Sequence, residues 1–290
     1  MSLLILLYNS LVMVFAYLIL AHKNPGQLKS MISALQTGNS HFFIHIDSKP
    51  GMQDFQQSMI DCPPNVHVCS KHIQINWGGF SMIEATVCLM DMLKDSGFRA
   101  DYVHLLSGQD FPLCAPDAID HFFEQNAGKN FIEYHILPYR RWAGNQGLDR
   151  IRYKWDVDGR KINKPALDVR DFPDGINPYG GSQWWSLTGD CVEWLTKVCR
   201  TGEVLYDFYR NTMIPDEMYF QTVILNSHFA QQVVNDNLRY IDFDSGPGYP
   251  RVLTCSDYDR LINSGKLFGR KFDIFQDANI LYKLTDIAAH

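Results

Sequence analysis

Segments typical of strands and of helices alternate through the first 135 residues of this 290-residue chain. An apolar strand, an amphipathic helix and a second apolar strand in succession favour parallel pairing, because the crossover helix packs against the sheet. We therefore expect an α/β fold in which a mostly parallel central sheet carries helices on both faces. The expected strands are Val14–Leu20, His41–Ile46, Asn65–Cys69, Asp101–Leu106 and Asn130–Tyr134, and the expected helices are Gly26–Thr37, Gln53–Ile60, Ser81–Lys94 and Pro116–Gln125.

Two local patterns refine this expectation. The spacing in Ser81-Met-Ile-Glu84 predicts a capping box at the start of the third helix. In parallel sheets, ligands bind outside the carboxyl ends of the strands. The loops that we expect to line a site are therefore residues 22–25, 47–50, 77–80 and 107–112.

The second half of the chain opens with a long basic segment, residues 136–182, which shows little periodicity. A loop of that length inside a compact domain is usually functional. Regular patterns then return, and they predict a strand at Gln183–Leu187, helices at Asp190–Arg200 and Pro215–Asn226, strands at Leu238–Phe243 and Arg251–Thr254, and helices at Ser256–Ser264 and Gln276–Ile287. Since no linker interrupts this order, we expect residues 14–290 to form a single domain.

The N-terminal residues are apolar, and Leu3–Ala21 carries no charge. That length just reaches a membrane span, but Asn9 interrupts it and its second half reads as a buried strand. We therefore interpret residues 1–13 as an apolar extension of a soluble protein. We expect a cytoplasmic location, at the inner face of the membrane if the protein associates peripherally with one.

The charge balance and the cysteines exclude several functional classes. The net charge is −6 and no basic tail is present, which argues against nucleic acid as a partner. Seven cysteines without a C-x-x-C pair predict buried, reduced thiols rather than a disulfide framework or a zinc ribbon.

Glu217 is the strongest candidate for a catalytic base. It lies in Ile214-Pro-Asp-Glu217, where a proline at a first helical position places Asp216 and Glu217 in the first turn. Acidic side chains there also stabilise the helix dipole. The chemical alternative is a carboxylate that takes a proton from a sugar or serine hydroxyl.

Cations near the C-terminus form a second candidate group. Arg251 follows a Gly- and Pro-rich turn, and Lys271 stands between Phe268 and Phe272. Solvated surface lysine is the ordinary interpretation of such residues, but an apolar frame can also hold a cation where it meets a diphosphate. Asp242-Phe-Asp244 follows an expected strand, and a D-x-D pair of this kind can hold a metal ion.

Polar residues also follow two of the expected strands. Leu105-Leu-Ser-Gly-Gln-Asp-Phe-Pro112 ends a strand in a glycine turn, and loops of this type commonly line sites. Asp47 closes a strand in the same way, and it either accepts a hydrogen bond from a ligand or caps the next turn.

Taken together, these segments resemble glycosyltransferase family 14, which comprises the core-2/I-branching N-acetylglucosaminyltransferases and the peptide O-xylosyltransferases. The resemblance runs from about Ala16 to Asp273. It rests on six motifs in the same order: Ala16-Tyr-Leu-Ile-Leu-Ala-His-Lys23, Ile44-His-Ile-Asp-Ser-Lys49, Trp77-Gly-Gly-Phe-Ser81, Gln146-Gly-Leu-Asp-Arg150, Gly180-Gly-Ser-Gln-Trp-Trp185 and Pro215-Asp-Glu217.

The resemblance implies a GT-A-type nucleotide-sugar-binding fold, a UDP-sugar donor carrying N-acetylglucosamine or xylose, a glycan or glycoconjugate acceptor, and inversion at the anomeric carbon without a metal ion or other cofactor. It also implies a role for each candidate residue. Glu217 would be the base, Arg251 and Lys271 would neutralise the diphosphate, His22 and Asp47 would lie near the uridine, Ser107, Gly108, Gln109 and Asp110 would lie near the donor sugar, and Arg150, Arg152 and Trp185 would flank the acceptor.

The resemblance leaves the acceptor and two rival functions open. Arg239-Tyr240-Ile241 replaces the Trp-x-Tyr pair with which the core-2 branch holds its acceptor, so the acceptor is not fixed by the resemblance. A metal-dependent transferase that uses Asp242 and Asp244 is one rival, and a non-catalytic carbohydrate-binding protein with the same fold is the other.

Overall fold

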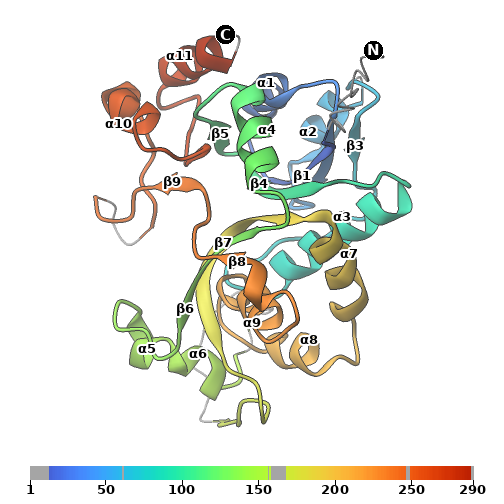
Figure 1. Cartoon of the computed structure of the whole chain (residues 1–290), viewed down its shortest axis with the longest axis vertical. Helices are drawn as coiled ribbons and strands as arrows, with labels where there is room; N and C mark the ends of the chain where they lie inside the picture. Colours follow the sequence, from blue (N-terminus) through green and yellow to red (C-terminus); the bar gives the residue numbers. More distant parts are fainter. Residues whose placement is uncertain (1–12, 61, 156, 158–167, 246–248, 289–290) are drawn as a thin grey trace, which may run out of the picture.

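The computed structural model describes residues 13–60, 62–155, 157, 168–245 and 249–288. Its larger sheet has the strand order β3-β2-β1-β4-β7-β6-β8 (Figure 1). These strands are β1 (Phe15–Ala21), β2 (Ser40–Ile46), β3 (Val66–Val68), β4 (Tyr102–Ser107), β6 (Asn130–Ile136), β7 (Tyr179–Thr188) and β8 (Val233–Val234). Strand β7 pairs antiparallel with β4 and β6, and the other neighbours pair parallel. The predicted α/β fold with a mostly parallel central sheet is confirmed.

Helices cover both faces of this sheet (Figure 1). The α-helices are α1 (Pro25–Leu35), α2 (Gln53–Ser58), α3 (Ser81–Asp95), α4 (Pro116–Gln125), α5 (Ala143–Gln146), α6 (Leu148–Arg152), α7 (Gly189–Val198), α8 (Val204–Tyr209), α9 (Tyr219–Leu225), α10 (Tyr258–Ile262) and α11 (Ala278–Ala288). Side chains alternate along β1, so Leu18 packs with α3, α7 and α9, whereas Tyr17 and Ile19 pack with α1, α4 and α11.

A small second sheet joins the first half of the chain to the C-terminal part. It consists of β5 (Asp110–Pro112), β10 (Phe268–Arg270) and β9 (Arg239–Ile241), with β10 in the middle. The antiparallel register of β10 and β5 places Arg270 opposite Asp110. Residues separated by 160 positions thus meet beside the carboxyl end of β4.

The predicted capping box at Ser81-Met-Ile-Glu84 is wrong. Helix α3 already begins at Ser81, whose hydroxyl oxygen accepts a hydrogen bond from the backbone N–H of Asn76. The carboxylate of Glu84 pairs with Arg210, at 3.0 Å. Both side chains that a capping box would use are therefore bonded to residues outside the helix.

Several predicted elements differ in extent. The strand predicted at Arg251–Thr254 is absent from the structure, because the backbone N–H of Arg251 donates to Asp242 and that of Leu253 donates to Lys271, so no single neighbour provides a ladder. The helix predicted at Pro215–Asn226 is divided into the 3₁₀ helix η1 (Pro215–Glu217) and α9. Two further 3₁₀ helices are η2 (Ala230–Gln232) and η3 (Cys255–Asp257).

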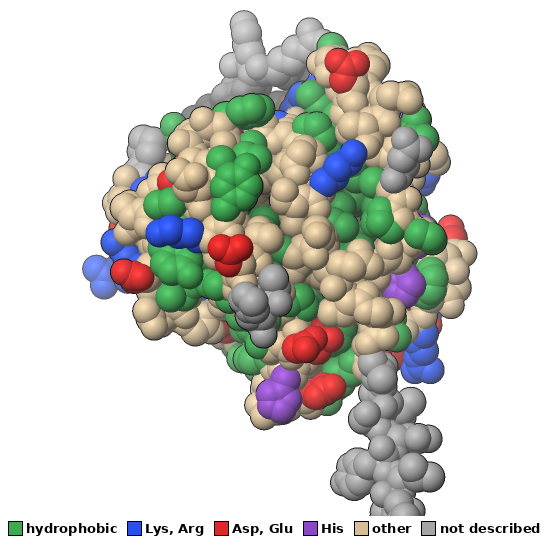
Figure 2. Space-filling model, turned by 90° about the horizontal axis from the view of Figure 1, so that it is seen from above, with side chains coloured by type: hydrophobic (Ala, Val, Ile, Leu, Met, Phe, Trp, Pro, Cys, Tyr) green, Lys and Arg blue, Asp and Glu red, His purple; other side chains and the backbone are tan. Residues whose placement is uncertain are grey.

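The predicted extension at residues 1–13 lies outside the described residues, except for Met13. In the part of the chain that the structure describes, no helix is both long and apolar enough to cross a membrane. On the face seen in Figure 2, Lys and Arg side chains are scattered and do not gather into one basic patch. The count of one domain for residues 14–290 stays a prediction.

Candidate functional site

Three loops meet at the carboxyl ends of the parallel strands β1, β2 and β4. The backbone N–H of Asp47 donates to the carbonyl of Ala21 at 2.8 Å, and the N–H of Gly108 donates to that of Leu20 at 3.0 Å. These two bonds extend the strand pairing by one step at this edge. His22, Asp47 and Ser107 come from three separate segments of the sequence. They therefore lie at the start of neighbouring loops.

The carboxylate of Asp47 is buried, and both of its oxygens have partners in the protein. Its Oδ1 accepts hydrogen bonds from the backbone N–H of Ile75 at 3.1 Å and of Lys49 at 3.3 Å, and its Oδ2 pairs with the Lys49 ammonium at 2.9 Å. Asp47 thus fixes its own turn and the segment that follows β3. The capping role expected of Asp47 is present, and a direct contact with a nucleotide stays a prediction.

His22 lies among charged residues, with its side chain exposed. Desolvation by neighbouring atoms lowers the pKa of His22 below its usual value, and the positive charges of Lys23 and Arg270 lower it further. The imidazole is therefore neutral at pH 7, and it can donate or accept a hydrogen bond without adding to the local charge.

Asp110 is fully buried beside the same edge. Its Oδ2 accepts from the backbone N–H of Ser107 at 3.1 Å, and its Oδ1 pairs with Nη1 of Arg270 at 2.8 Å. The Arg270 guanidinium in turn lies 4.2 Å from the ring centroid of Trp184. Burial raises the pKa of Asp110, while Arg270 opposes that rise. The sequence analysis assigned no site role to Arg270 or Trp184, although each stands next to a candidate residue.

Gln109 and Gly108 have structural partners in this loop. The Gln109 side-chain amide donates to the carbonyl of Phe272 at 3.1 Å, and the N–H of Phe272 donates back to the Gln109 carbonyl at 2.8 Å. A Cβ atom added to Gly108 would lie 3.4 Å from the side chain of Ala21, so this backbone packs closely on β1. These two hydrogen bonds hold the loop after β4 against Phe272, the residue that follows Lys271.

Lys271 follows β10 directly and is half-buried. Its carbonyl accepts a hydrogen bond from Leu253 at 2.9 Å, and its ammonium lies 4.8 Å from the ring centroid of Tyr249. Among the described residues, no carboxylate forms an ion pair with this ammonium. Burial lowers the pKa of Lys271, and the charges of Arg270 and Lys23 lower it further. The charge of Asp273 acts in the opposite direction, so the side chain is a partly desolvated cation that forms no ion pair in the described part of the chain.

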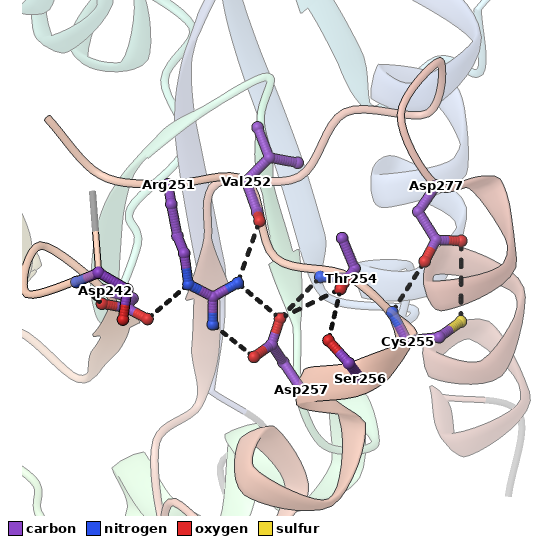
Figure 3. A network of polar contacts seen from close by, with 9 residues as sticks. Asp242, Arg251, Val252, Thr254, Cys255, Ser256, Asp257 and Asp277 are labelled. Carbon is purple, nitrogen blue, oxygen red and sulfur yellow. Dashed lines mark hydrogen bonds and ion pairs between the residues drawn. The ribbon is translucent and has the colours of Figure 1, made fainter. Parts of the chain in front are cut away.

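Arg251, the second predicted diphosphate cation, stands between two carboxylates (Figure 3). Its Nε donates to Asp242 Oδ2 at 2.6 Å, its Nη1 donates to Asp257 Oδ2 at 2.9 Å, and its Nη2 donates to Asp257 Oδ1. Hydrogen bonding to Arg251 holds the pKa of Asp257 below its usual value, and a bond from Ser245 followed by one from Arg251 does so for Asp242. Asp242 is therefore occupied, while Asp244 is exposed.

Glu217 is the last residue of η1, which packs against β7. Its Oε2 pairs with Nη1 of Arg150 at 2.8 Å, and the Arg150 guanidinium lies 3.9 Å from the ring centroid of Trp142. Burial and then the charge of Glu217 raise the pKa of Asp216 to about 7. The structure therefore joins the predicted base to one of the predicted acceptor residues.

The Trp77-Gly-Gly motif supports the segment that carries this base. The backbone N–H of Ile214 donates to the carbonyl of Gly78 at 2.9 Å. Gly78 has a φ of 75°, and Ile214 has a φ of 51°. Both residues that share this hydrogen bond thus have a left-handed backbone conformation. Ile214 directly precedes η1, so the bond fixes where η1 begins. The left-handed region favours glycine, which explains the glycine at position 78.

The other two predicted acceptor residues differ in exposure. Trp185 is fully buried and packs against Phe220, with ring centroids 5.8 Å apart. We therefore assign Trp185 to the core and correct its predicted contact with an acceptor. Arg152 is exposed and lines a cavity of about 300 Å³ together with Ile151 and Phe172.

Comparisons with known proteins identify the family of this chain. A family model described as "Branch: Core-2/I-Branching enzyme" matches residues 15–261. "Xylosyltransferase oxt" of Drosophila pseudoobscura pseudoobscura is 28% identical over 285 residues, which are 90% of this chain and 31% of that protein. "Xylosyltransferase 2" of Rattus norvegicus and of Homo sapiens are each 28% identical over 291 residues, covering 92% of this chain and 32% of those proteins. The chain thus spans about a third of the length of these relatives.

Similar solved structures include a cytidylyltransferase from Leptospira borgpetersenii, with a TM-score of 0.33 and 15% identity over 69% of this chain and 68% of that chain. Another is S. aureus TarS 1-349, with a TM-score of 0.38 and 9% identity over 76% of this chain and 57% of that chain. The match of the family model spans well over half of the sequence and includes Glu217 and Arg251. The chain therefore belongs to the Core-2/I-branching enzyme family of glycosyltransferases.

Proposed function

We propose that this protein is an inverting glycosyltransferase that moves N-acetylglucosamine or xylose from a UDP-sugar to a hydroxyl of a glycan acceptor, without a metal ion. Membership of the family supports the transferase class. The donor, the acceptor and the stereochemistry are part of the proposal, because the aligned relatives are about three times as long as the segment they share with this chain.

The proposed donor site is the edge formed by the loops after β1, β2 and β4. His22 and Asp47 lie on the nucleotide side, and Ser107 to Asp110 lie on the side of the donor sugar. The hydrogen bonds that hold these loops in place support such a site, since loops that are already ordered lose little conformational entropy when a ligand binds. A neutral His22 adds a hydrogen-bonding group there. It carries no positive charge that would attract the phosphates away from Lys271 and Arg251.

Lys271 is proposed to neutralise the charge that develops on UDP. Its ammonium carries no ion pair among the described residues, so a phosphate oxygen would not have to displace an acidic partner. Because the ammonium is partly desolvated, it also has less water to lose when the ligand binds. This cation, which forms no ion pair with any described residue and directly follows β10, is the single observation that carries the proposal.

Arg251 is proposed as the weaker of the two cations. The hydrogen bond from Leu253 to the Lys271 carbonyl places the segment of Arg251 next to that of Lys271. The two carboxylates around Arg251 already offset its charge, so it supports the diphosphate mainly as a hydrogen-bond donor and as the anchor of this segment.

Glu217 is proposed to take the proton from the acceptor hydroxyl. The acceptor oxygen forms its bond to the anomeric carbon on the face opposite UDP, and the electron pair of the breaking carbon–oxygen bond leaves with the diphosphate. A single displacement of this kind inverts the anomeric centre. Arg150 holds the Glu217 carboxylate in one orientation until the acceptor arrives, and it offers donors to the acceptor's hydroxyl groups.

The experiment that tests the proposal measures UDP release from UDP-N-acetylglucosamine and UDP-xylose, with and without galactose-containing disaccharides and serine peptides as acceptors. Binding is measured in parallel by thermal shift, since a ligand at 100 times its Kd stabilises by about 2.7 kcal/mol. Acceptor-dependent UDP release with an inverted product, seen by proton NMR, is the expected result. A thermal shift without transfer to any acceptor would favour the carbohydrate-binding alternative.

A further inference from the structure

Cys69 and Cys88 bring their sulfur atoms to 3.0 Å from each other, although they stand 19 residues apart. Cys69 directly follows β3 and is half-buried, and Cys88 lies in the middle of α3 and is 6% exposed. A disulfide has an S–S distance of about 2.05 Å, so the two atoms would need to approach by only roughly 1 Å.

The surroundings of the pair make the two sulfur atoms unequal. A hydrogen bond from the Cys88 thiol lowers the pKa of Cys69 to about 6, and the nearby charges of Lys71 and His72 act in the same direction. The same bond, followed by burial, raises the pKa of Cys88. A thiolate is the reactive form of cysteine, so the half-exposed sulfur is the nucleophile and the buried one remains a thiol.

We propose that Cys69 and Cys88 form a reactive dithiol site that a low-molecular-weight disulfide, such as oxidised glutathione, converts into an internal disulfide. Cys69 attacks one glutathione sulfur, forms a mixed disulfide and releases one glutathione thiolate. Cys88 then loses its proton and attacks Cys69, and the second glutathione leaves. The protein is oxidised by two electrons, and oxidised glutathione is reduced to two molecules of glutathione.

The loop that this bond would close contains contacts that reach across the molecule. The carbonyl of Ile73 accepts from the N–H of Ser48, and the N–H of Ile75 donates to Asp47. Further along the same loop, Gly78 accepts the hydrogen bond from Ile214. A covalent link between the end of β3 and α3 restrains all three contacts, whatever the protein's substrate is.

The test exposes the full-length chain, in its native state, to a series of glutathione redox buffers, followed by alkylation and peptide mapping. The expected product is a Cys69–Cys88 disulfide in which the chain has lost two hydrogen atoms. Cys88→Ser should stop at a stable glutathione adduct on Cys69, and Cys69→Ser should yield neither product. Cys114→Ser is the matched control, because burial raises the pKa of the half-buried Cys114 to about 11, and this variant should react as the wild type does.

The oxidised wild type supplies a readout that needs no variant. Amide exchange across residues 70–80 should slow, and the melting temperature should rise by a few degrees, since the bond closes a loop of moderate length. An unchanged mass for the wild type in oxidising buffer would overturn the proposal. Glutathione adducts that form as rapidly at Cys114 or Cys255 as at Cys69 would overturn it as well.

Discussion

The guanidinium of Arg150 lies 2.8 Å from the carboxylate of Glu217, with Nη1 donating to Oε2. The pair joins α6, within the long basic segment, to η1, where the proposed base stands. Partly exposed ion pairs contribute only about 0–1 kcal/mol to stability, so this contact does little to hold the fold together. Its main effect is to orient the carboxylate, and in the proposed mechanism Arg150 also offers a hydrogen-bond donor to the acceptor sugar beside Glu217.

The first prediction concerns Glu217→Gln. The amide keeps the size of the side chain but cannot take a proton, so kcat should fall at least about 100-fold, the usual scale for general base catalysis. The Kd of UDP should not change, because the base contacts the acceptor. Steady-state kinetics and calorimetry measure the two quantities. Glu124→Gln, at an exposed position on α4, is the matched control. Near-normal turnover of Glu217→Gln would remove Glu217 from the mechanism.

The two cations should respond differently to substitution, which is the second prediction. Lys271→Ala should weaken UDP binding far more than uridine binding while leaving the melting temperature nearly unchanged, because Lys271 has no ion pair in the described structure. Arg251→Ala should weaken UDP binding and also destabilise the fold, since it leaves Asp242 and Asp257 without their shared partner.

The control for this comparison is Lys266→Ala, because Lys266 precedes β10, whereas Lys271 follows it, and pairs with Asp236 at 2.8 Å. It should affect neither ligand. Calorimetry with UDP and with uridine separates a diphosphate contact from a nucleoside contact. Equal losses for both ligands in Lys271→Ala would mean that this lysine does not meet the diphosphate.

The third prediction is that the Arg251 network contributes stability that acid removes. The folded-state pKa values of Asp242 and Asp257 lie below their usual values. Groups with a depressed pKa stabilise the fold above the unfolded pKa of about 3.9, and this contribution is lost as the pH falls through the folded pKa. Stability should therefore decline between roughly pH 4 and pH 2.

Urea unfolding at pH 7 and at pH 3 measures this decline. The drop should be larger for the wild type than for Arg251→Ala, because the variant's carboxylates have lost the partner that depresses their pKa values. Other acidic residues titrate in both proteins, so their effect cancels in the difference. Equal drops in the two proteins would show that Arg251 does not stabilise the ionised carboxylates.

The fold could be predicted from the sequence where apolar runs alternate with helical periodicity. Strand β1 begins at Phe15 and β2 at Ser40, each within one residue of the predicted start. Periodicity of side chains encodes such elements locally. The strand predicted at Arg251–Thr254 is wrong for the opposite reason. The backbone N–H groups of that segment donate to two distant partners, Asp242 and Lys271, which local periodicity does not encode.

The site could be predicted only in part for a related reason. Strand ends gave Asp47 and Asp110, because parallel strands present their carboxyl ends at one edge. The sequence could not assign Trp185 to the core, since neighbouring side chains on a strand point to opposite faces and the sequence alone does not show which face is covered. It also could not pair Arg270 with Asp110 or Arg150 with Glu217, because a short pattern carries no information about contacts over 67 or 160 residues.

The last prediction is that transfer continues in excess EDTA. In this fold the loop after β4 is the usual place for a metal-binding pair of acids, and here it offers Asp110 alone. Arg270 already neutralises that buried carboxylate at 2.8 Å, and Arg251 engages Asp242 of the D-x-D pattern. A metal ion would have to displace a guanidinium at either place, so the ion pair that each carboxylate now makes opposes metal binding.

We therefore expect Asp244→Asn to leave the Kd of the donor nearly unchanged and added manganese to raise the rate by no more than a small factor. Asp110→Asn should instead lower the melting temperature, because it leaves Arg270 without its buried partner. The measurement is UDP release after extensive dialysis against EDTA, followed by addition of manganese or magnesium. Activity that disappears on chelation and returns with manganese would contradict the proposal that Lys271 and Arg251 neutralise the diphosphate without a metal ion. It would make Asp242 and Asp244 the metal ligands, with Arg251 moving away from Asp242 when the ion binds.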